Sequence, residues 1–66
     1  MIKVKIDKIL KEQDKSLYWL AKATELSYPT IHRLVNNKTS SISFDTLEKI
    51  CLALDVDIED ILKIVK

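Results

Sequence analysis

Glycine is absent from this chain, and proline, cysteine, tryptophan and phenylalanine each occur once among its 66 residues. Glycine adopts a positive φ at no steric cost, so any left-handed turn here must use Asn, Asp or a bulkier residue. The scarcity of glycine and proline favours helices joined by short turns and argues against a β-sandwich. Cys51 alone cannot form a disulfide within the chain. With His32 as the only histidine, a four-ligand zinc site is excluded too.

Long apolar runs are also missing. No stretch suits a signal peptide or a membrane span, so we expect a cytoplasmic protein with no membrane partner. Sixty-six residues allow one domain, spanning 1–66, which buries roughly 60% of the surface of its unfolded chain. The sequence is 47% hydrophobic and 32% charged, a balance typical of a folded domain.

The chain is organised around residues 16–38, SLYWLAKATELSYPTIHRLVNNK. The apolar spacing predicts one helix over 17–24, ending at 23 or 24, and a second over 28–36. Ser16 and Ser27 each precede a helix by one residue, where a hydroxyl can accept a free backbone N–H. Pro29 lies in the first turn of the second helix, where its missing N–H costs nothing. The buried positions expected at helical spacing are Leu20, Ala21, Ile31, Leu34 and Val35.

The second helix of this pair leaves a row of hydrogen-bonding side chains on its outer face. One of them, an arginine, is always positively charged. A short helix that buries one face and exposes such a row is suited to contact with a polar partner. The row consists of Tyr28, Thr30, His32, Arg33 and Asn36.

These residues resemble a known family of DNA-binding proteins. Leu20-Ala21, Leu26-Ser27, Thr30-Ile31, Arg33-Leu34 and Asn37-Lys38 are similar to the helix-turn-helix of the Cro/C1-type (XRE-like) family, and ISFDTLEKICLAL is similar to the helix that follows. The likeness spans about Ile6 to Val65. It implies an all-α, compact five-helix, lambda-repressor-like domain, with or without a short N-terminal strand. Two positions depart from the family: Leu17 replaces a usual Gln or other polar residue, and Glu25 replaces a frequent Gly.

The resemblance implies a transcriptional regulator, expected to be a repressor, that binds double-stranded DNA and inserts helix 28–36 into the major groove. The candidates for reading base edges are Ser27, Tyr28, Thr30, His32 and Arg33. The candidates for holding phosphates are Ser16, Asn36, Lys38 and Thr39.

The segments flanking the central pair predict three further helices. A helical stripe from Ile6 ends near Asp14, and the Asn36-Asn37 pair can supply a left-handed residue that ends the second helix of the motif. Ser43 is expected to cap a fourth helix, and Asp57, with Asp60 three residues on, to cap a fifth. The expected buried stripes are Phe44, Leu47, Ile50, Cys51 and Leu54, then Ile58, Ile61, Leu62 and Val65.

The first six residues alternate Ile2, Val4 and Ile6 with lysines, which is the period of a strand. A single short strand is not stable alone, so it is expected to pair with another chain or to lie extended against the domain. We also expect the apolar C-terminal helix to favour self-association. Together these features predict a weak homodimer, strengthened on a palindromic site.

Charge differs between the two parts of the chain. Residues 1–42 hold eight Lys or Arg against four Asp or Glu, a net of +4, whereas residues 43–66 hold three Lys against six acids, a net of −3. A polyanion should therefore meet the N-terminal two thirds. The total is only +1, so the motif supports DNA binding more strongly than composition does.

Each candidate residue also has a plainer interpretation. His32 is often simply a solvated histidine in such a position, and Arg33 could pair with a nearby acid. Cys51 lies on a core stripe, where packing is far commoner than nucleophilic chemistry. One of Tyr18 and Trp19 should be partly exposed, and Trp19 either covers the N-terminal segment or faces a partner.

The residue inventory argues against an enzyme. There is no glycine-rich phosphate loop, no Ser–His–Asp spacing and no carboxylate pair placed in an obvious cleft, and no cofactor is expected. The alternative to a DNA-binding regulator is a protein-interaction module of the same fold, such as an antitoxin-like or anti-repressor partner. Leu17 and the low net charge favour that alternative, whereas the polar row on helix 28–36 favours DNA.

Overall fold

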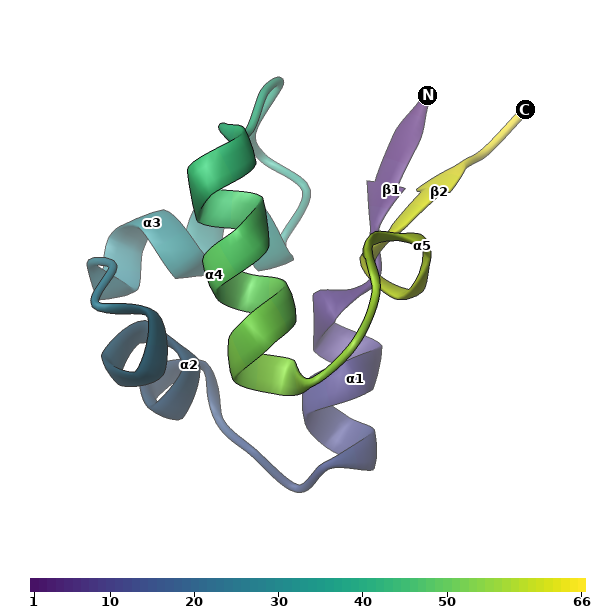
Figure 1. The fold of residues 1–66 in the computed structure, drawn as a ribbon. Coiled ribbons are helices and arrows are strands. Elements are labelled where there is room, and N and C mark those ends of the chain that lie inside the picture. Colours follow the sequence, from purple (N-terminus) through teal and green to yellow (C-terminus); the bar gives the residue numbers. More distant parts are fainter.

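The computed structural model describes residues 1–66 as five helices and a two-stranded sheet (Figure 1). The predicted number of helices is confirmed. None of these helices has the length and apolar character needed to cross a membrane. In chain order the elements are β1 (Ile2–Val4), α1 (Ile6–Glu12), α2 (Leu17–Thr24), α3 (Tyr28–Val35), α4 (Phe44–Leu54), α5 (Ile58–Ile61) and β2 (Leu62–Ile64).

All five helices contribute to one apolar core, with α4 in the middle of the arrangement (Figure 1). Each short helix buries one stripe, as the sequence spacing predicts. Thr24 is the one buried polar residue, and its hydroxyl donates to the Leu20 carbonyl at 2.7 Å. The twelve buried apolar residues are Ile6, Ile9, Leu10, Leu20, Ala21, Ile31, Leu34, Val35, Leu47, Ile50, Leu54 and Ile61.

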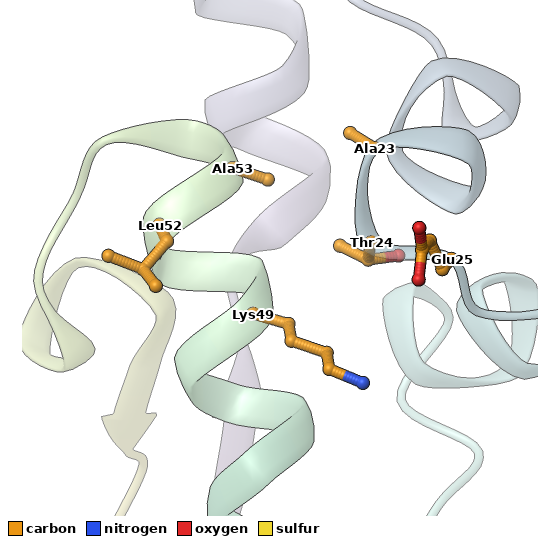
Figure 2. Close-up of a pocket in the computed structure, with 6 residues that line it drawn as sticks. All are labelled: Ala23, Thr24, Glu25, Lys49, Leu52 and Ala53. Atoms are coloured by element: carbon orange, nitrogen blue, oxygen red, sulfur yellow. The ribbon is translucent and has the colours of Figure 1, made fainter.

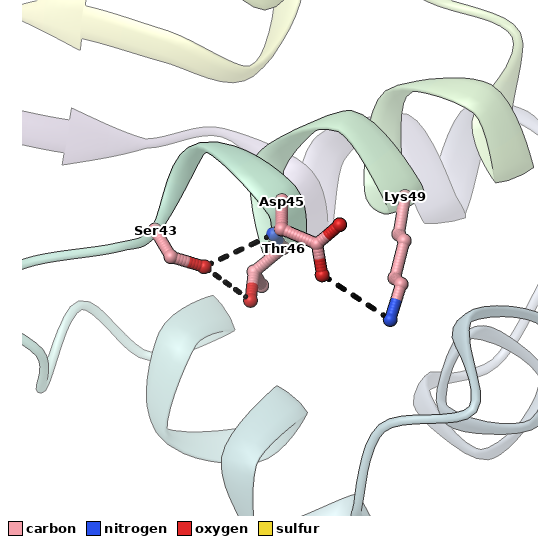
Figure 3. A network of polar contacts seen from close by, with 4 residues as sticks. All are labelled: Ser43, Asp45, Thr46 and Lys49. Carbon is pink, nitrogen blue, oxygen red and sulfur yellow. Dashed lines mark hydrogen bonds and ion pairs between the residues drawn. The ribbon is translucent and has the colours of Figure 1, made fainter.

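Side-chain caps begin the central helices where the sequence predicts them. The Ser43 hydroxyl accepts the Thr46 N–H at 3.1 Å, and one turn later Lys49 pairs with Asp45 at 3.3 Å (Figure 3). At α5, the Asp60 carboxylate accepts the Asp57 N–H at 3.0 Å, as in the acidic capping box that was expected. These local hydrogen bonds satisfy donors that the first turn of a helix leaves free.

A shallow pocket of about 400 Å³ separates the C-terminal end of α2 from α4 (Figure 2). Ala23 and Ala53 line the pocket with small side chains, while Leu52 points away from α2 in the figure. The Lys49 side chain extends from α4 toward the turn after α2 (Figure 2). Thr24 and Glu25 complete the lining.

The prediction for Phe44 is wrong. Leu47, Ile50 and Leu54 are buried and Cys51 is half-buried, but the Phe44 side chain is 89% exposed. Periodicity identifies the apolar face of a helix but not which part of that face another element covers, and the first turn of α4 leaves Phe44 exposed.

The prediction that the C-terminal helix continues to Val65 is also wrong. The helix α5 has only four residues, Ile58 is exposed, and the chain continues as the strand β2. Leu62–Ile64 fits both a helical stripe and a strand alternation, so its own spacing cannot decide between them. Pairing with β1, about sixty residues away, selects the strand.

The strands β1 and β2 pair antiparallel, with Ile2 opposite Ile64 and Val4 opposite Leu62. The N-terminal strand therefore has a partner within its own chain, which corrects the expectation that it pairs with another chain or merely lies extended. Both ends of the chain lie side by side in this ribbon (Figure 1).

Asn37 fastens the ribbon to the segment that follows α3. Its Oδ1 accepts the Val4 N–H at 2.7 Å, and its Nδ2 donates to the Val4 carbonyl at 3.5 Å. The amide thus occupies the outer edge of β1 as a neighbouring strand would. Asn37 has a φ of 59°, which confirms the left-handed residue predicted for the Asn36-Asn37 pair.

We predict that Asn37→Gly lowers the free energy of unfolding by about 0.5–1.5 kcal/mol, because glycine keeps the positive φ but loses the bonds to Val4. Asn37→Ala should lower the free energy of unfolding by roughly 1 kcal/mol more than Asn37→Gly does, because alanine is strained at that φ. Urea denaturation measures both variants, with Asn36→Ala as the neighbouring control. Equal stabilities for the glycine variant and the parent protein would show that the hydrogen bonds from Asn37 to Val4 do not stabilise the fold.

Candidate nucleic-acid interface

The helices α2 and α3 and the turn between them form the unit predicted from the sequence. The Ser16 hydroxyl accepts the Trp19 N–H at 3.0 Å, and the Ser27 hydroxyl accepts the Thr30 N–H at 3.4 Å. Both serines therefore act as N-caps. The predicted helix boundaries agree with the structure, except that α3 ends at Val35 and Asn36 is its C-cap.

Glu25 makes the turn between these helices without glycine. It has a φ of 60°, and the Leu26 N–H beyond it donates to the Ala21 carbonyl at 3.2 Å. This backward hydrogen bond closes the C-terminal end of α2. The family's frequent glycine is thus replaced by a residue that adopts the same left-handed conformation at a steric cost.

Burial of one side of α3 determines which of its side chains face outward. Ile31, Leu34 and Val35 are buried in the core. The five members of the predicted polar row are all exposed on the remaining surface: Tyr28, Thr30, His32, Arg33 and Asn36.

Several of these exposed side chains are held by neighbours on the same helix. The Tyr28 and His32 rings lie with centroids 6.0 Å apart, and the Asn36 Nδ2 donates to the His32 carbonyl at 2.7 Å. The Ser27 and Thr30 hydroxyl oxygens are 2.7 Å apart. The rigid spacing of a helix turn thus orders most of the row before any partner binds.

Arg33 differs from the rest of the row because it has no partner. The two ion pairs of the protein join Lys11 to Asp7 and Lys49 to Asp45, so no carboxylate neutralises Arg33. The plainer interpretation, in which this arginine pairs with a nearby acid, is therefore wrong for the free protein. Its guanidinium remains available for an anionic or acceptor-rich surface.

The predicted phosphate contacts lie at both ends of the helix pair. Ser16 is exposed at the start of α2, and Lys38 is exposed just after α3. Thr39 is half-buried and lines a groove with residues of the β-ribbon. Leu17, at the position where the family has a polar residue, is half-buried and packs against the core.

The two aromatic residues of α2 have different surroundings. Tyr18 is 60% exposed, which confirms that one of the pair is exposed, and Lys22 lies 5.0 Å from its ring centroid. Trp19 is half-buried against the core, and the Lys15 ammonium lies 4.0 Å from its ring centroid. Trp19 thus combines packing with a cation–π contact.

Cys51 has the properties of a packing residue. Its side chain is half-buried, and burial raises the pKa of the thiol, an effect to which the carboxylates of Asp57 and Asp60 add. A raised pKa leaves the thiol protonated near neutral pH, which disfavours nucleophilic chemistry. No group of three His, Cys, Asp or Glu side chains is placed to hold a metal ion.

The sequence patterns missed the role of Asn37, which links this interface to the chain ends. Asn37 was expected only to end α3, yet its side chain bonds the Val4 backbone, 33 positions away. Nothing in the local sequence signals so distant a partner. The pair of asparagines indicates only that a helix ends there.

Comparison with models of protein families matches residues 5–66 to the Cro/C1-type HTH DNA-binding domain. The match covers nearly all of the chain, so the chain belongs to this family. It is a DNA-binding domain of the class found in transcription regulators, with α2 and α3 as its helix-turn-helix. A comparison of the sequence with curated proteins found no match.

We predict that Glu25→Gly raises the free energy of unfolding by up to about 1 kcal/mol, because it removes the steric cost of a left-handed glutamate. Lys22→Gly, inside α2, is the matched control and should lower the free energy of unfolding by about 1 kcal/mol. Urea denaturation compares the two variants. If Glu25→Gly were as destabilising as the control, the turn would not be strained.

Proposed function

We propose that this domain is a sequence-specific regulator of transcription that inserts α3 into the major groove of duplex DNA. The observation that supports this most directly is the unpaired Arg33 within an exposed polar row on a short helix. The major groove admits one α-helix, and its base edges present a pattern of donors and acceptors that such side chains can distinguish.

We assign the base-reading role to residues at the start and middle of α3. An arginine pairs best with the O6 and N7 acceptors of guanine, so Arg33 would specify one G·C pair. The bonded hydroxyls of Ser27 and Thr30 would contact base edges as one unit, and the rings of Tyr28 and His32 would lie against the neighbouring bases.

The phosphate-binding role belongs in this proposal to the two ends of the motif. Lys38 supplies charge after α3, and Asn36 keeps its Oδ1 and one amide hydrogen beyond its bond to His32. Thr39 and Ser16 provide hydroxyls next to backbone N–H groups. Such contacts set the position of the protein on the duplex and add little sequence preference.

We propose that the effect on transcription is repression by occlusion, with residues 1–66 acting as one unit. A domain whose α3 occupies the major groove covers the DNA that it binds. Another protein is thereby denied the same base pairs.

An alternative function is supported by Leu17. Its side chain packs on the core where the family usually has a polar residue, which removes one phosphate contact. Together with a net charge of only +1, this favours a protein-interaction module that retains the fold. Selection from random duplex DNA separates the two functions, because an interaction module would enrich no sequence motif although it is folded.

We predict that Arg33→Ala weakens binding to the selected site by about 1–3 kcal/mol and relaxes the preference at one base position. Arg33→Lys is the matched control, because lysine keeps the charge but loses the bidentate fork. It should retain binding to random DNA while losing the base preference. Equal losses of Arg33→Ala on selected and random duplexes, measured by titration, would make Arg33 a phosphate contact instead.

We further propose that two copies bind together as a weak homodimer. The outer side of α4 and the start of α5 expose an apolar patch: Phe44 is 89% exposed, Leu52 is 74% exposed and Ile58 is 56% exposed. Exposed apolar patches commonly mark protein interfaces. A second copy is the partner we favour, since pairing of two identical patches about a two-fold axis is the commonest form of self-association.

The dimer should be weak because Glu48 and Asp57 line the same patch and would repel their counterparts. We predict that self-association in sedimentation experiments strengthens with salt, whereas DNA binding weakens. Phe44→Ser should abolish self-association without loss of stability, and Tyr18→Ser, which removes another exposed aromatic side chain, is the control. A monomer at every concentration, with one protein per duplex on the selected site, would contradict the dimer.

A further inference from the structure

A groove of about 560 Å³ lies between the β-ribbon, the start of α1 and the C-terminal end of α3. Four lysines line it: Lys3, Lys5, Lys8 and Lys63. They come from both ends of the chain, because pairing of β1 with β2 brings residues 3 and 63 together. The only acid in the lining is Asp7.

The register of the ribbon makes this concentration of charge unfavourable for the free protein. Lys3 lies directly opposite Lys63, so both side chains extend from the same face of the sheet. Like charges directly opposite each other destabilise a strand pair. The opposite face holds Ile2, Ile64 and their apolar neighbours, so the two lysines have no alternative side in this register.

No carboxylate in the protein relieves this repulsion. Asp7 already pairs with Lys11 at 3.2 Å, and the other ion pair lies within α4. Lys5 donates to the Glu59 backbone carbonyl at 3.4 Å, which orients its ammonium without neutralising it. The groove therefore has an excess of positive charge and many free N–H donors, which suits an anion with several oxygens.

The position of the groove relative to α3 is determined by Asn37. Val35, from the last turn of α3, and Asn37 both line the groove. The two bonds of the Asn37 amide to Val4 hold β1 against the end of that helix. The lysines are therefore carried by a rigid extension of the helix-turn-helix.

We propose that this lysine groove binds phosphates of the duplex backbone beyond the C-terminal end of α3. The inference rests on the proposed function, since it assumes that α3 occupies the major groove. The N-terminal residues of a recognition helix contact the base edges, so in this placement the C-terminal end of α3 lies nearer the phosphate backbone that borders the groove. The chain termini, through their ribbon, extend the contact with DNA past the bases that α3 reads.

Duplex DNA suits this groove better than an acidic peptide or free phosphate. Three of the lysines lie in β1, α1 and β2 and the fourth, Lys5, joins β1 to α1, so successive phosphates along a backbone can satisfy them together. Each neutralised phosphate changes the slope of log K against log salt by about 0.9. Two lysine contacts should therefore contribute a slope of about 1.8 that the helix-turn-helix itself does not supply.

The test uses the double variant Lys3→Gln/Lys63→Gln and two duplexes. One duplex ends at the base pairs that α3 protects, and the other extends by about half a turn beyond the C-terminal end of α3. On the longer duplex, the variant should bind roughly tenfold or more weakly at low salt, with the slope reduced by about 1.8. On the short duplex, variant and parent should bind alike.

Two controls separate this effect from general charge loss and from unfolding. Lys11→Gln/Lys49→Gln removes the same charge from lysines that are already paired. It should leave the difference in affinity between the longer and the short duplex nearly unchanged. Lys3→Arg/Lys63→Arg should retain binding. The glutamine variant should also melt at a higher temperature than the parent, because it removes the cross-strand repulsion.

The outcomes distinguish the two proposals. If the parent protein shows salt-dependent binding but the glutamine variant matches it on both duplexes, the lysine groove does not bind DNA. The same conclusion follows if the variant loses affinity equally for both duplexes. It also follows if the substitution weakens binding to an added polyglutamate peptide and leaves DNA binding unchanged. If the parent protein binds neither duplex, the proposed function itself fails.

Discussion

The helices of this domain depend on one shared core, because none is long enough to be stable alone. They contain four to eleven residues, and isolated helices below about 12–15 residues are marginal in water. The helix α3 is ordered by burial of Ile31, Leu34 and Val35, and the same burial decides which side chains face outward. The exposed polar row is thus the side of α3 that remains in solvent when its apolar side is buried in the core. Any substitution that loosens this packing should disturb DNA binding and stability together.

The absence of glycine places a second constraint on the domain. Four residues adopt a positive φ, namely Asp14, Glu25, Asn37 and Asp55, and each ends a helix or follows its end. Asn and Asp tolerate this conformation better than other side chains, so three of the four turns use the cheapest substitutes for glycine. At Asn37 the substitute gains a second role, because a glycine would have no amide to hold β1. The turn residue therefore connects the helix-turn-helix with both ends of the chain.

Agreement between sequence and structure is closest where the signals are local. The serine caps of α2, α3 and α4, the left-handed Asn37 and the limits of the helix pair all depend on residues within one or two turns. The predictions for Phe44 and the C-terminal segment are wrong, because periodicity identifies the apolar face of a segment but not whether another element covers that face. Phe44 continues the stripe of α4, but its side chain is 89% exposed. Leu62–Ile64 fits two periods, and only the distant strand β1 selects one.

The sequence alone determined the family, the helix-turn-helix and the composition of the row on α3, because caps and apolar spacing act over a few residues. Only the tertiary structure decided that Arg33 has no acidic partner, that Asn37 bonds Val4, and that Lys3 faces Lys63. The last two of these contacts join positions 33 and 60 residues apart, and their geometry follows from how the helices pack around α4. The positive groove beside α3 exists because the two ends of the chain meet as strands, a pairing that neither end can specify by itself.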